Sequence, residues 1–147
     1  MKLVSEVDSG FVALLGLELD EATADRVTAH WKVRPELLQP HGILHGGVHC
    51  AVVETLGSIG ATCWLGDAGH VVGVANQTDF LRAVRAGTLR AEALPVFRGR
   101  TQQLWTVEIR DDADRVVARG QVRLQNIPVN PPAGRRDGGT TGEPATG

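Results

Sequence analysis

The segment from residue 46 to residue 65 constrains the fold of this chain more than any other part of its sequence. It is apolar on nearly every side and free of proline, and a run of this length and composition predicts a helix. One aliphatic stripe follows it, made by Val48, Val52, Leu56, Ile59 and Cys63. Because a helix that is apolar all round is normally buried, we expect this one at the centre of the fold.

Two glycines inside this helix, Gly57 and Gly60, weaken it. Each costs a helix about 1 kcal/mol relative to alanine. Close approach of another backbone would explain that cost, so we expect a neighbouring subunit to pack there. A single helix is also too little to cover a long sheet. Both features predict an obligate oligomer, either a homodimer or a homotetramer.

Alternation of apolar and polar residues predicts strands on both sides of the helix. Two strands precede it, at residues 16–20 and 26–33. Four strands follow it, at residues 71–84, 88–97, 102–110 and 115–125. The acidic residues 111–114 predict the turn of a hairpin between the last two strands. One central helix against an antiparallel sheet is an α+β fold.

The two ends of the chain are expected to differ in order. Residues 5–15 predict a short helix that is capped by Ser5 and packs through Val7, Phe11, Leu14 and Leu15. Residues 128–147 hold four of the seven prolines and almost no large apolar side chain. Such a segment buries too little surface to offset its ordering entropy. We therefore expect one domain at residues 1–127 and a disordered tail at residues 128–147.

Composition excludes several classes of partner. A net charge of -2 gives no reason to expect nucleic acid or an anionic membrane. We find no run of the roughly 20 apolar residues that a membrane-spanning helix needs. The first residues carry no signal-peptide pattern. Cys50 and Cys63 suggest no disulfide framework, so we expect a protein of the reducing cytoplasm.

Glu54 is the anomaly in the apolar helix. Four residues make about one helical turn, so Cys50, Glu54 and Ser58 share one small polar face. A carboxylate on a buried helix is costly unless it is satisfied, and such groups often mark functional sites. The structural alternative is that Glu54 reaches solvent or pairs with an arginine, and that Ser58 is only a small packing residue.

The helix is entered through a glycine-rich loop that runs from Gln39 to Gly47 and contains His45-Gly46-Gly47. Glycines at a helix start leave backbone N–H groups unobstructed, and the helix dipole favours negative charge there. Such a site suits the oxyanion that develops on a reacting carbonyl. The same glycines would also serve a tight turn, but a carboxylate eight residues after Gly46 makes a catalytic site the better interpretation.

The histidines His41, His45 and His49 recur at a spacing of four, which could hold a metal. Glycines around the first two place them in the loop, so the three do not share a helical face. No HExxH arrangement is present either. We therefore expect no metal, with His45 shaping the turn and His49 packing or facing solvent.

These residues together resemble the hotdog-fold thioesterases of the phenylacetate-degradation type, which include the aryl-CoA thioesterases. The resemblance is carried by Gln39, the His45-Gly46-Gly47 motif and Glu54 nine residues after His45, and by residues 76–82 and Gly99-Arg100 further along. It extends over roughly residues 17–126. Glu54 stands where aspartate is commoner, as in the aryl-CoA branch, and His41 has no counterpart that assigns it a role.

The resemblance implies a hotdog fold, an antiparallel sheet wrapped around one long central helix, and hydrolysis of an acyl- or aryl-CoA thioester. Glu54 would be general base or nucleophile, the Gly46 N–H would hold the oxyanion, Gln39 would touch the carbonyl or the attacking water, and Ser58 would assist Glu54. Substrate-binding roles would fall to His45, Gly47, Asn76, Gln77, Thr78 and Asp79. It further implies no cofactor and active sites at a dimer interface, with Glu54 beside residues 76–79 of the other subunit.

Two other functions remain open on the sequence alone. A hotdog enoyl-CoA hydratase would need an Asp/His pair on the loop before the helix, and neither His41 nor His45 has an aspartate at that place. A non-catalytic acyl-CoA-binding module would use the same fold without the chemistry. The complete set of Gln39, Gly46 and Glu54 argues for the enzyme.

Overall fold

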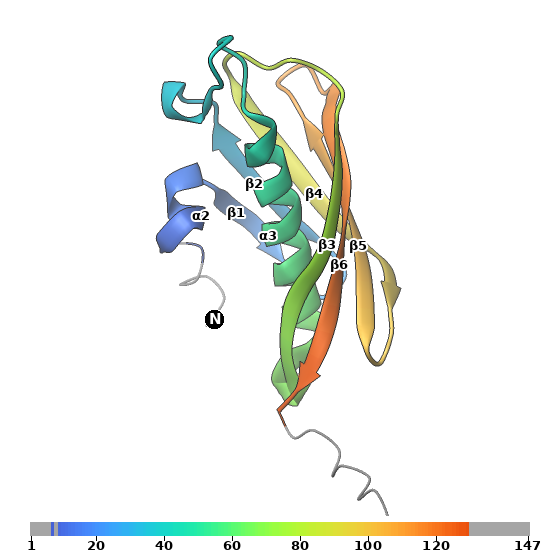
Figure 1. The fold of residues 1–147 in the computed structure, drawn as a ribbon. Helices are drawn as coiled ribbons and strands as arrows, with labels where there is room; N and C mark the ends of the chain where they lie inside the picture. The colour runs from blue at the N-terminus through green and yellow to red at the C-terminus, as the bar shows by residue number, and fades with distance from the viewer. Residues whose placement is uncertain (1–6, 8, 130–147) are drawn as a thin grey trace, which may run out of the picture.

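The computed structural model describes residue 7 and residues 9–129 of the chain. Six strands form one sheet in the order β1-β2-β4-β5-β6-β3, and every neighbouring pair is antiparallel. The strands are β1 (Glu18–Ala22), β2 (Val27–Lys32), β3 (Gly69–Phe80), β4 (Thr88–Arg98), β5 (Gln102–Arg110) and β6 (Val116–Pro128). The helix α3 (Gly46–Leu65) lies along one face of this sheet (Figure 1). The α+β prediction is confirmed.

The central helix has the bounds that the sequence predicted. It begins at Gly46, directly after His45. The backbone of His45 is extended, and its side chain caps the helix by accepting from the Gly47 N–H. It ends at Gly66, where a φ of 58° suits glycine. Its aliphatic side packs on β2 to β6, with Val52, Val53 and Leu56 fully enclosed.

The helix is not buried on every side, and here the prediction was wrong. Many of its residues are buried, several of them against the sheet, but Glu54 is exposed within one chain. The prediction also missed that Gly46–Ala68 is long and apolar enough to cross a membrane by length and composition alone. Packing of the helix on the sheet accounts for that apolar character, as in the core helix of many folds.

The two helix glycines are explained by the sheet of the same chain rather than by a neighbouring subunit. A Cβ at Gly57 would lie 2.2 Å from Cγ1 of Val122, and one at Gly60 would lie 2.5 Å from the ring of Trp105. Real Cβ atoms do not approach other atoms so closely, so both positions require glycine for the helix to touch the sheet. These glycines therefore give no support to an oligomer.

The strands confirm the predicted order but differ at their ends. The strand β3 stops at Phe80, four residues before the expected end, because the backbone N–H groups of Leu81 and Arg82 both donate to the oxygen of Val117. Val84 then accepts from Leu44, which ties the next loop to the entry of α3. At the other end, β6 ends at Pro128, one residue after the predicted domain end at residue 127.

The N-terminal helix is shorter than predicted. The structure has α2 at Gly10–Leu15, and the predicted cap Ser5 lies outside the described residues. Leu15 is buried as expected, but Phe11 and Leu14 are 65% and 70% exposed. Of the predicted tail at residues 128–147, residues 130–147 also lie outside the described residues.

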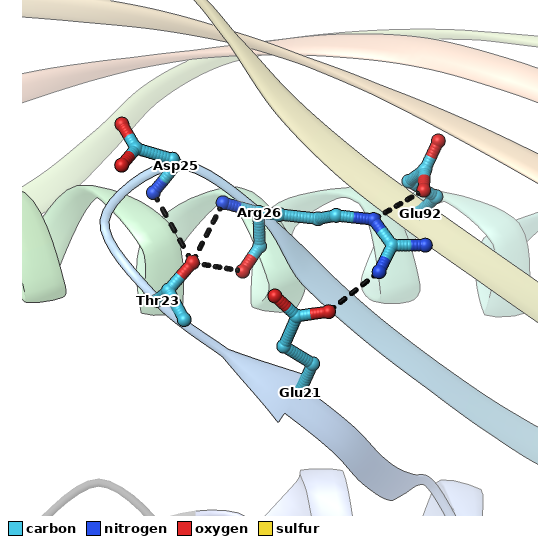
Figure 2. Close-up of polar contacts among 5 residues, drawn as sticks. All are labelled: Glu21, Thr23, Asp25, Arg26 and Glu92. Carbon is cyan, nitrogen blue, oxygen red and sulfur yellow. Dashed lines mark hydrogen bonds and ion pairs between the residues drawn. The ribbon is translucent and has the colours of Figure 1, made fainter.

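The hairpin of β1 and β2 is fixed by polar contacts (Figure 2). The Thr23 hydroxyl accepts from the backbone N–H groups of Asp25 and Arg26, which closes the turn. The Arg26 guanidinium then donates to Glu21 at 2.5 Å and to Glu92 at 2.6 Å. Arg26, directly before β2, thus links Glu21 of β1 to Glu92 of β4.

The strand at the opposite edge, β3, is longer, with 12 residues against 5 in β1. The strand β3 pairs with β6 on one side only, and its other side has no strand against it among the described residues. Nearly all of its residues are exposed, including Val72 and Val74. A long, apolar and unpaired edge strand is a template for pairing with another chain.

Candidate active site

Glu54 lies in a hollow between α3 and the N-terminal helix α2. The hollow has a volume of about 420 Å³, and its walls are mainly apolar, with Phe11, Val12 and Ile59 among them. Ser58, one turn further along α3, lines the same hollow. The predicted Glu54–Ser58 face therefore exists, although it is open rather than buried. Among the described residues no cation forms an ion pair with Glu54, so the arginine pair of the structural alternative is not found there, whereas the exposure of Glu54 within one chain agrees with the other half of that alternative.

The carboxylate of Glu54 also lies against the edge strand. A Cβ at Gly73 of β3 would be 3.2 Å from Oε1 of Glu54, a contact tighter than most Cβ atoms make. Glycine at this position therefore leaves room for the carboxylate beside the backbone of β3. The sequence did not indicate this contact, because residue 73 is distant in sequence and belongs to no motif.

The start of α3 offers one unoccupied backbone donor. The His45 N–H donates to the oxygen of Leu37 at 2.9 Å, and the Gly47 N–H donates to Nδ1 of His45 at 2.8 Å. The Val48 N–H donates to the oxygen of His45 at 2.9 Å. Among the described residues the Gly46 N–H has no acceptor. Gly46 thus keeps its N–H free among the described residues, while Gly47 is already bonded and His45 acts as a cap.

Gln39 is held in a defined orientation beside this donor. Its side-chain oxygen Oε1 accepts from the His41 N–H at 2.6 Å, so the amide NH₂ is the end left for a ligand. Gln39 and Gly46 line one hollow of about 260 Å³. Arg85 donates to the backbone oxygens of His41 and Gly42 and so braces the loop that carries Gln39. His41, which had no assigned role, serves here through its backbone.

Phe80, at the end of β3, covers the Gly46 backbone. A Cβ at residue 46 would lie 2.3 Å from the Phe80 ring, so only glycine allows the ring this close. The ring is nevertheless 57% exposed, because it caps the hollow from outside. Sequence reasoning missed Phe80 as part of this site, since its position depends on how β3 passes the helix.

The four predicted substrate-binding residues of β3 lie on opposite faces of the sheet. Asn76 faces α3, where its amide donates to the oxygen of Cys50 at 2.9 Å, and the Thr78 hydroxyl donates to Asn76. Gln77 and Asp79 line a separate hollow on the face away from the helix. Alternation along a strand causes this division. Of these four residues, Asn76 and Thr78 lie on the face of the sheet that packs against α3 within one chain.

Gly46 and Glu54 do not form one site within a single chain. They are eight residues apart on α3, which corresponds to about 12 Å along the axis and about 80° around it. One oxygen held by the Gly46 N–H and one water held by Glu54 span only about 6 Å through two hydrogen bonds. The two residues accordingly line different hollows.

His49 is a feature that the sequence analysis left open between packing and solvent. The side chain is buried, and burial lowers its pKa to about 4, so the imidazole is neutral near pH 7. It lines the hollow of Gly46 and contacts Phe80, with ring centroids 5.9 Å apart. In the part of the chain that the structure describes, no three His, Cys, Asp or Glu side chains are placed to hold a metal ion.

Comparisons with known proteins identify the family of this chain. The family model described as Thioesterase superfamily matches residues 41–118, which include both Gly46 and Glu54. A Mycobacterium tuberculosis protein named as an esterase is 52% identical over 82% of this chain and 89% of its own length. The solved structure of that protein superimposes with a TM-score of 0.80 and covers 82% of this chain and 98% of the solved chain.

Two further relatives are named as thioesterases. The proofreading thioesterase EntH of Cronobacter turicensis is 36% identical over 69% of this chain and 74% of its own length. The crystal structure of a thioesterase from Haemophilus influenzae is 32% identical, with a TM-score of 0.80 over 84% of this chain and 87% of that one. The chain therefore belongs to the thioesterase superfamily with the hotdog fold, and it is a thioester hydrolase.

Proposed function

We propose that this chain hydrolyses acyl-CoA or aryl-CoA thioesters to the free acid and CoA, with Glu54 and Gly46 as the reacting pair. The observation that carries the proposal is the combination of a free Gly46 N–H at a helix start with an unpaired carboxylate on the same helix. Thioester hydrolysis requires these two groups, a donor for the carbonyl oxygen and a base or nucleophile for attack.

In the proposed reaction the thioester oxygen accepts from the Gly46 N–H and from the amide of Gln39. Glu54 removes a proton from water as the water oxygen bonds to the carbonyl carbon. Negative charge then develops on the carbonyl oxygen, where the donor and the helix dipole stabilise it. Collapse breaks the C–S bond, and the proton held by Glu54 passes to the departing thiolate. Direct attack by the Glu54 carboxylate would require the same two groups.

The separation of Gly46 and Glu54 leads us to propose that each active site is shared by two copies of the chain. The unpaired edge of β3 supports antiparallel pairing with a second β3. A register that places Gly73 opposite Phe80 of the partner subunit would bring Glu54, which lies against Gly73, near the partner's Gly46. A two-fold axis then generates two equivalent sites.

The hollow beside Glu54 supports an apolar acyl group. Its walls include Phe11 and Val12 of the N-terminal region and Ile59 of α3, and its volume of about 420 Å³ leaves room for an aryl or medium-length acyl chain. Apolar walls with a few polar groups at one end are typical of small-molecule sites. We therefore expect acetyl-CoA to be a poor substrate.

A panel of acyl-CoAs from acetyl to benzoyl, followed by chromogenic capture of the released thiol, tests the proposal. We expect hydrolysis that favours the larger apolar groups. Glu54→Gln should lower kcat by at least about 10²-fold, the lower range for loss of a general base. Its unfolding free energy should change by less than about 0.5 kcal/mol, because the carboxylate is exposed.

Glu18→Gln is the matched control, because Glu18 is an exposed glutamate of the edge strand β1 and is distant in the sheet from β3. It should retain wild-type turnover. A wild-type protein that binds acyl-CoAs without releasing thiol would instead support the non-catalytic binding module. Near-normal turnover by a stable Glu54→Gln protein would remove Glu54 from the mechanism.

A further inference from the structure

The buried imidazole of His49 is incompletely satisfied. The side chain is only 3% exposed, and its Nδ1 is fully enclosed without a hydrogen-bond partner among the described residues. An unsatisfied buried polar group costs about 1–3 kcal/mol, so such groups are rare unless they serve a purpose. The other atom of this kind in the described part of the chain is Nε1 of Trp31, which lies in the core of β2.

The position of His49 on α3 relates it to the donor at the helix start. It follows Gly46 by three residues, a spacing that places two residues on the same helical face. Side chains of an α-helix lean toward its N-terminus, so the imidazole points back toward the turn of Gly46. The two residues line one hollow, and Phe80 packs against both.

The charge state of His49 suits a hydrogen-bond donor. Burial lowers its pKa to about 4, so at neutral pH the ring carries one proton and no charge. Nδ1 is enclosed, whereas Nε2 is not among the enclosed atoms. A neutral imidazole with its proton on Nε2 can polarise a carbonyl oxygen without bringing a second charge into an apolar site.

We propose that His49 is a third oxyanion donor beside Gly46 and Gln39, which hydrogen-bonds through Nε2–H to the same thioester oxygen that the Gly46 N–H holds. The inference rests on the proposed role of Gly46 and extends it. The ring keeps its proton throughout the reaction, so the proton that reaches the leaving thiolate still comes from Glu54. Phe80 contacts the ring, with the two centroids 5.9 Å apart, and so helps to hold its orientation.

Substitution of His49 tests the proposal on the full-length protein. His49→Leu keeps an apolar shape of similar size and removes both ring nitrogens, so the melting temperature should hold or rise. Its kcat should fall at least about tenfold, because one oxyanion-hole donor is worth roughly 10²–10³ in rate and the Gly46 and Gln39 donors remain. His49→Gln supplies an N–H of similar reach and should recover part of the loss in kcat.

The matched control is Trp31→Phe, which removes the other unpartnered buried nitrogen at a place that lines neither hollow of the site. It should leave kcat and KM unchanged whatever it does to the melting temperature. A His49→Leu protein with wild-type kcat would overturn the proposal and leave His49 as a packing residue. Equal losses of kcat in all three variants would overturn it as well.

A direct measurement keeps the test decisive if His49→Leu does not fold. Glu54→Gln protein with ¹⁵N-labelled histidines is titrated with an acyl-CoA analogue in which a methylene replaces the thioester sulfur. We expect the Nε2 resonance of His49 to shift at saturation. The resonances of His30, a β2 residue hydrogen-bonded to Asp20 of β1, should stay unchanged. An unshifted His49 at saturation overturns the inference. Absence of hydrolysis of every CoA thioester by the wild type would instead reject the proposed function.

Discussion

Replacement of Gly46 by proline removes the proposed oxyanion donor without breaking the helix. Residue 46 is the first residue of α3, where proline is favoured because its missing N–H has no helical partner. His45 before it has a φ of -65° and a ψ of 132°, which a following proline accepts. Any Cβ at residue 46 would collide with the ring of Phe80, so the test needs Phe80→Ala in the background.

The informative comparison is therefore between two double variants that carry Phe80→Ala, one with Gly46→Pro and one with Gly46→Ala. They differ chiefly in the N–H of residue 46. Loss of one such donor is expected to lower kcat by roughly 10²–10³, or about 2.7–4 kcal/mol of transition-state stabilisation. The melting temperatures should be close, because the lost N–H donates to no described residue.

Thiol release at saturating substrate measures kcat, and thermal unfolding of the same preparation checks the fold. If the proline variant stays within threefold of the alanine variant, Gly46 is not the donor and the proposed reaction is wrong. A second measurement addresses the shared site. Random mixing of the proline variant with a Glu54→Gln chain that also carries Phe80→Ala should give about half mixed dimers with one intact site each, and so about a quarter of the activity of a Phe80→Ala reference.

Three further predictions address the acyl hollow, the edge strand and pH. Phe11→Ala should raise KM for benzoyl-CoA several-fold, because Phe11 lines the hollow of Glu54, whereas Leu14→Ala on the same helix should not, because Leu14 does not line that hollow; equal KM values in the two variants would contradict this. Val72→Lys should convert the dimer to an inactive monomer in sedimentation, since a lysine blocks an edge strand, while Val96→Lys on an interior strand should stay dimeric. The pKa of His49 is about 4 in the folded protein and 6.5 in the unfolded chain, so the unfolded state binds more protons between these values. The free energy of unfolding should therefore reach its plateau above pH 6.5 and should fall by on the order of 3 kcal/mol on acidification toward pH 4. In denaturant titrations His49→Leu should reduce this dependence of the free energy of unfolding on pH, and an unchanged dependence would contradict the assignment.

Parts of this fold were predictable because they are encoded locally. The bounds of α3 follow from a proline-free apolar run that starts after a capping histidine and ends at Gly66. The hairpin at residues 111–114 is equally local, since the Asp111 side chain accepts from the backbone of Ala113 and Arg115 within the turn itself. Such signals need no knowledge of distant residues.

Other parts could not be predicted because they depend on contacts between distant segments. The sequence predicted a subunit contact at Gly57 and Gly60, yet Val122 and Trp105 of the same chain occupy that space. His49 could be placed on the helix but not inside the fold, because its burial depends on how Phe80 at the end of β3 passes the helix. Neither arrangement leaves a trace in local periodicity.

The spacing of Gly46 and Glu54 illustrates the limit of a sequence motif. In the sequence the two residues are eight apart and predict one site with a donor and a base. On a helix the same spacing is a displacement of about 12 Å, which separates them into different hollows. The motif keeps its catalytic meaning only if a second chain, antiparallel to the first along the open edge of β3, supplies the missing half of each pair. The motif thus argues for an assembly as well as for a reaction, and loss of that assembly should abolish turnover even when Gly46 and Glu54 are both intact.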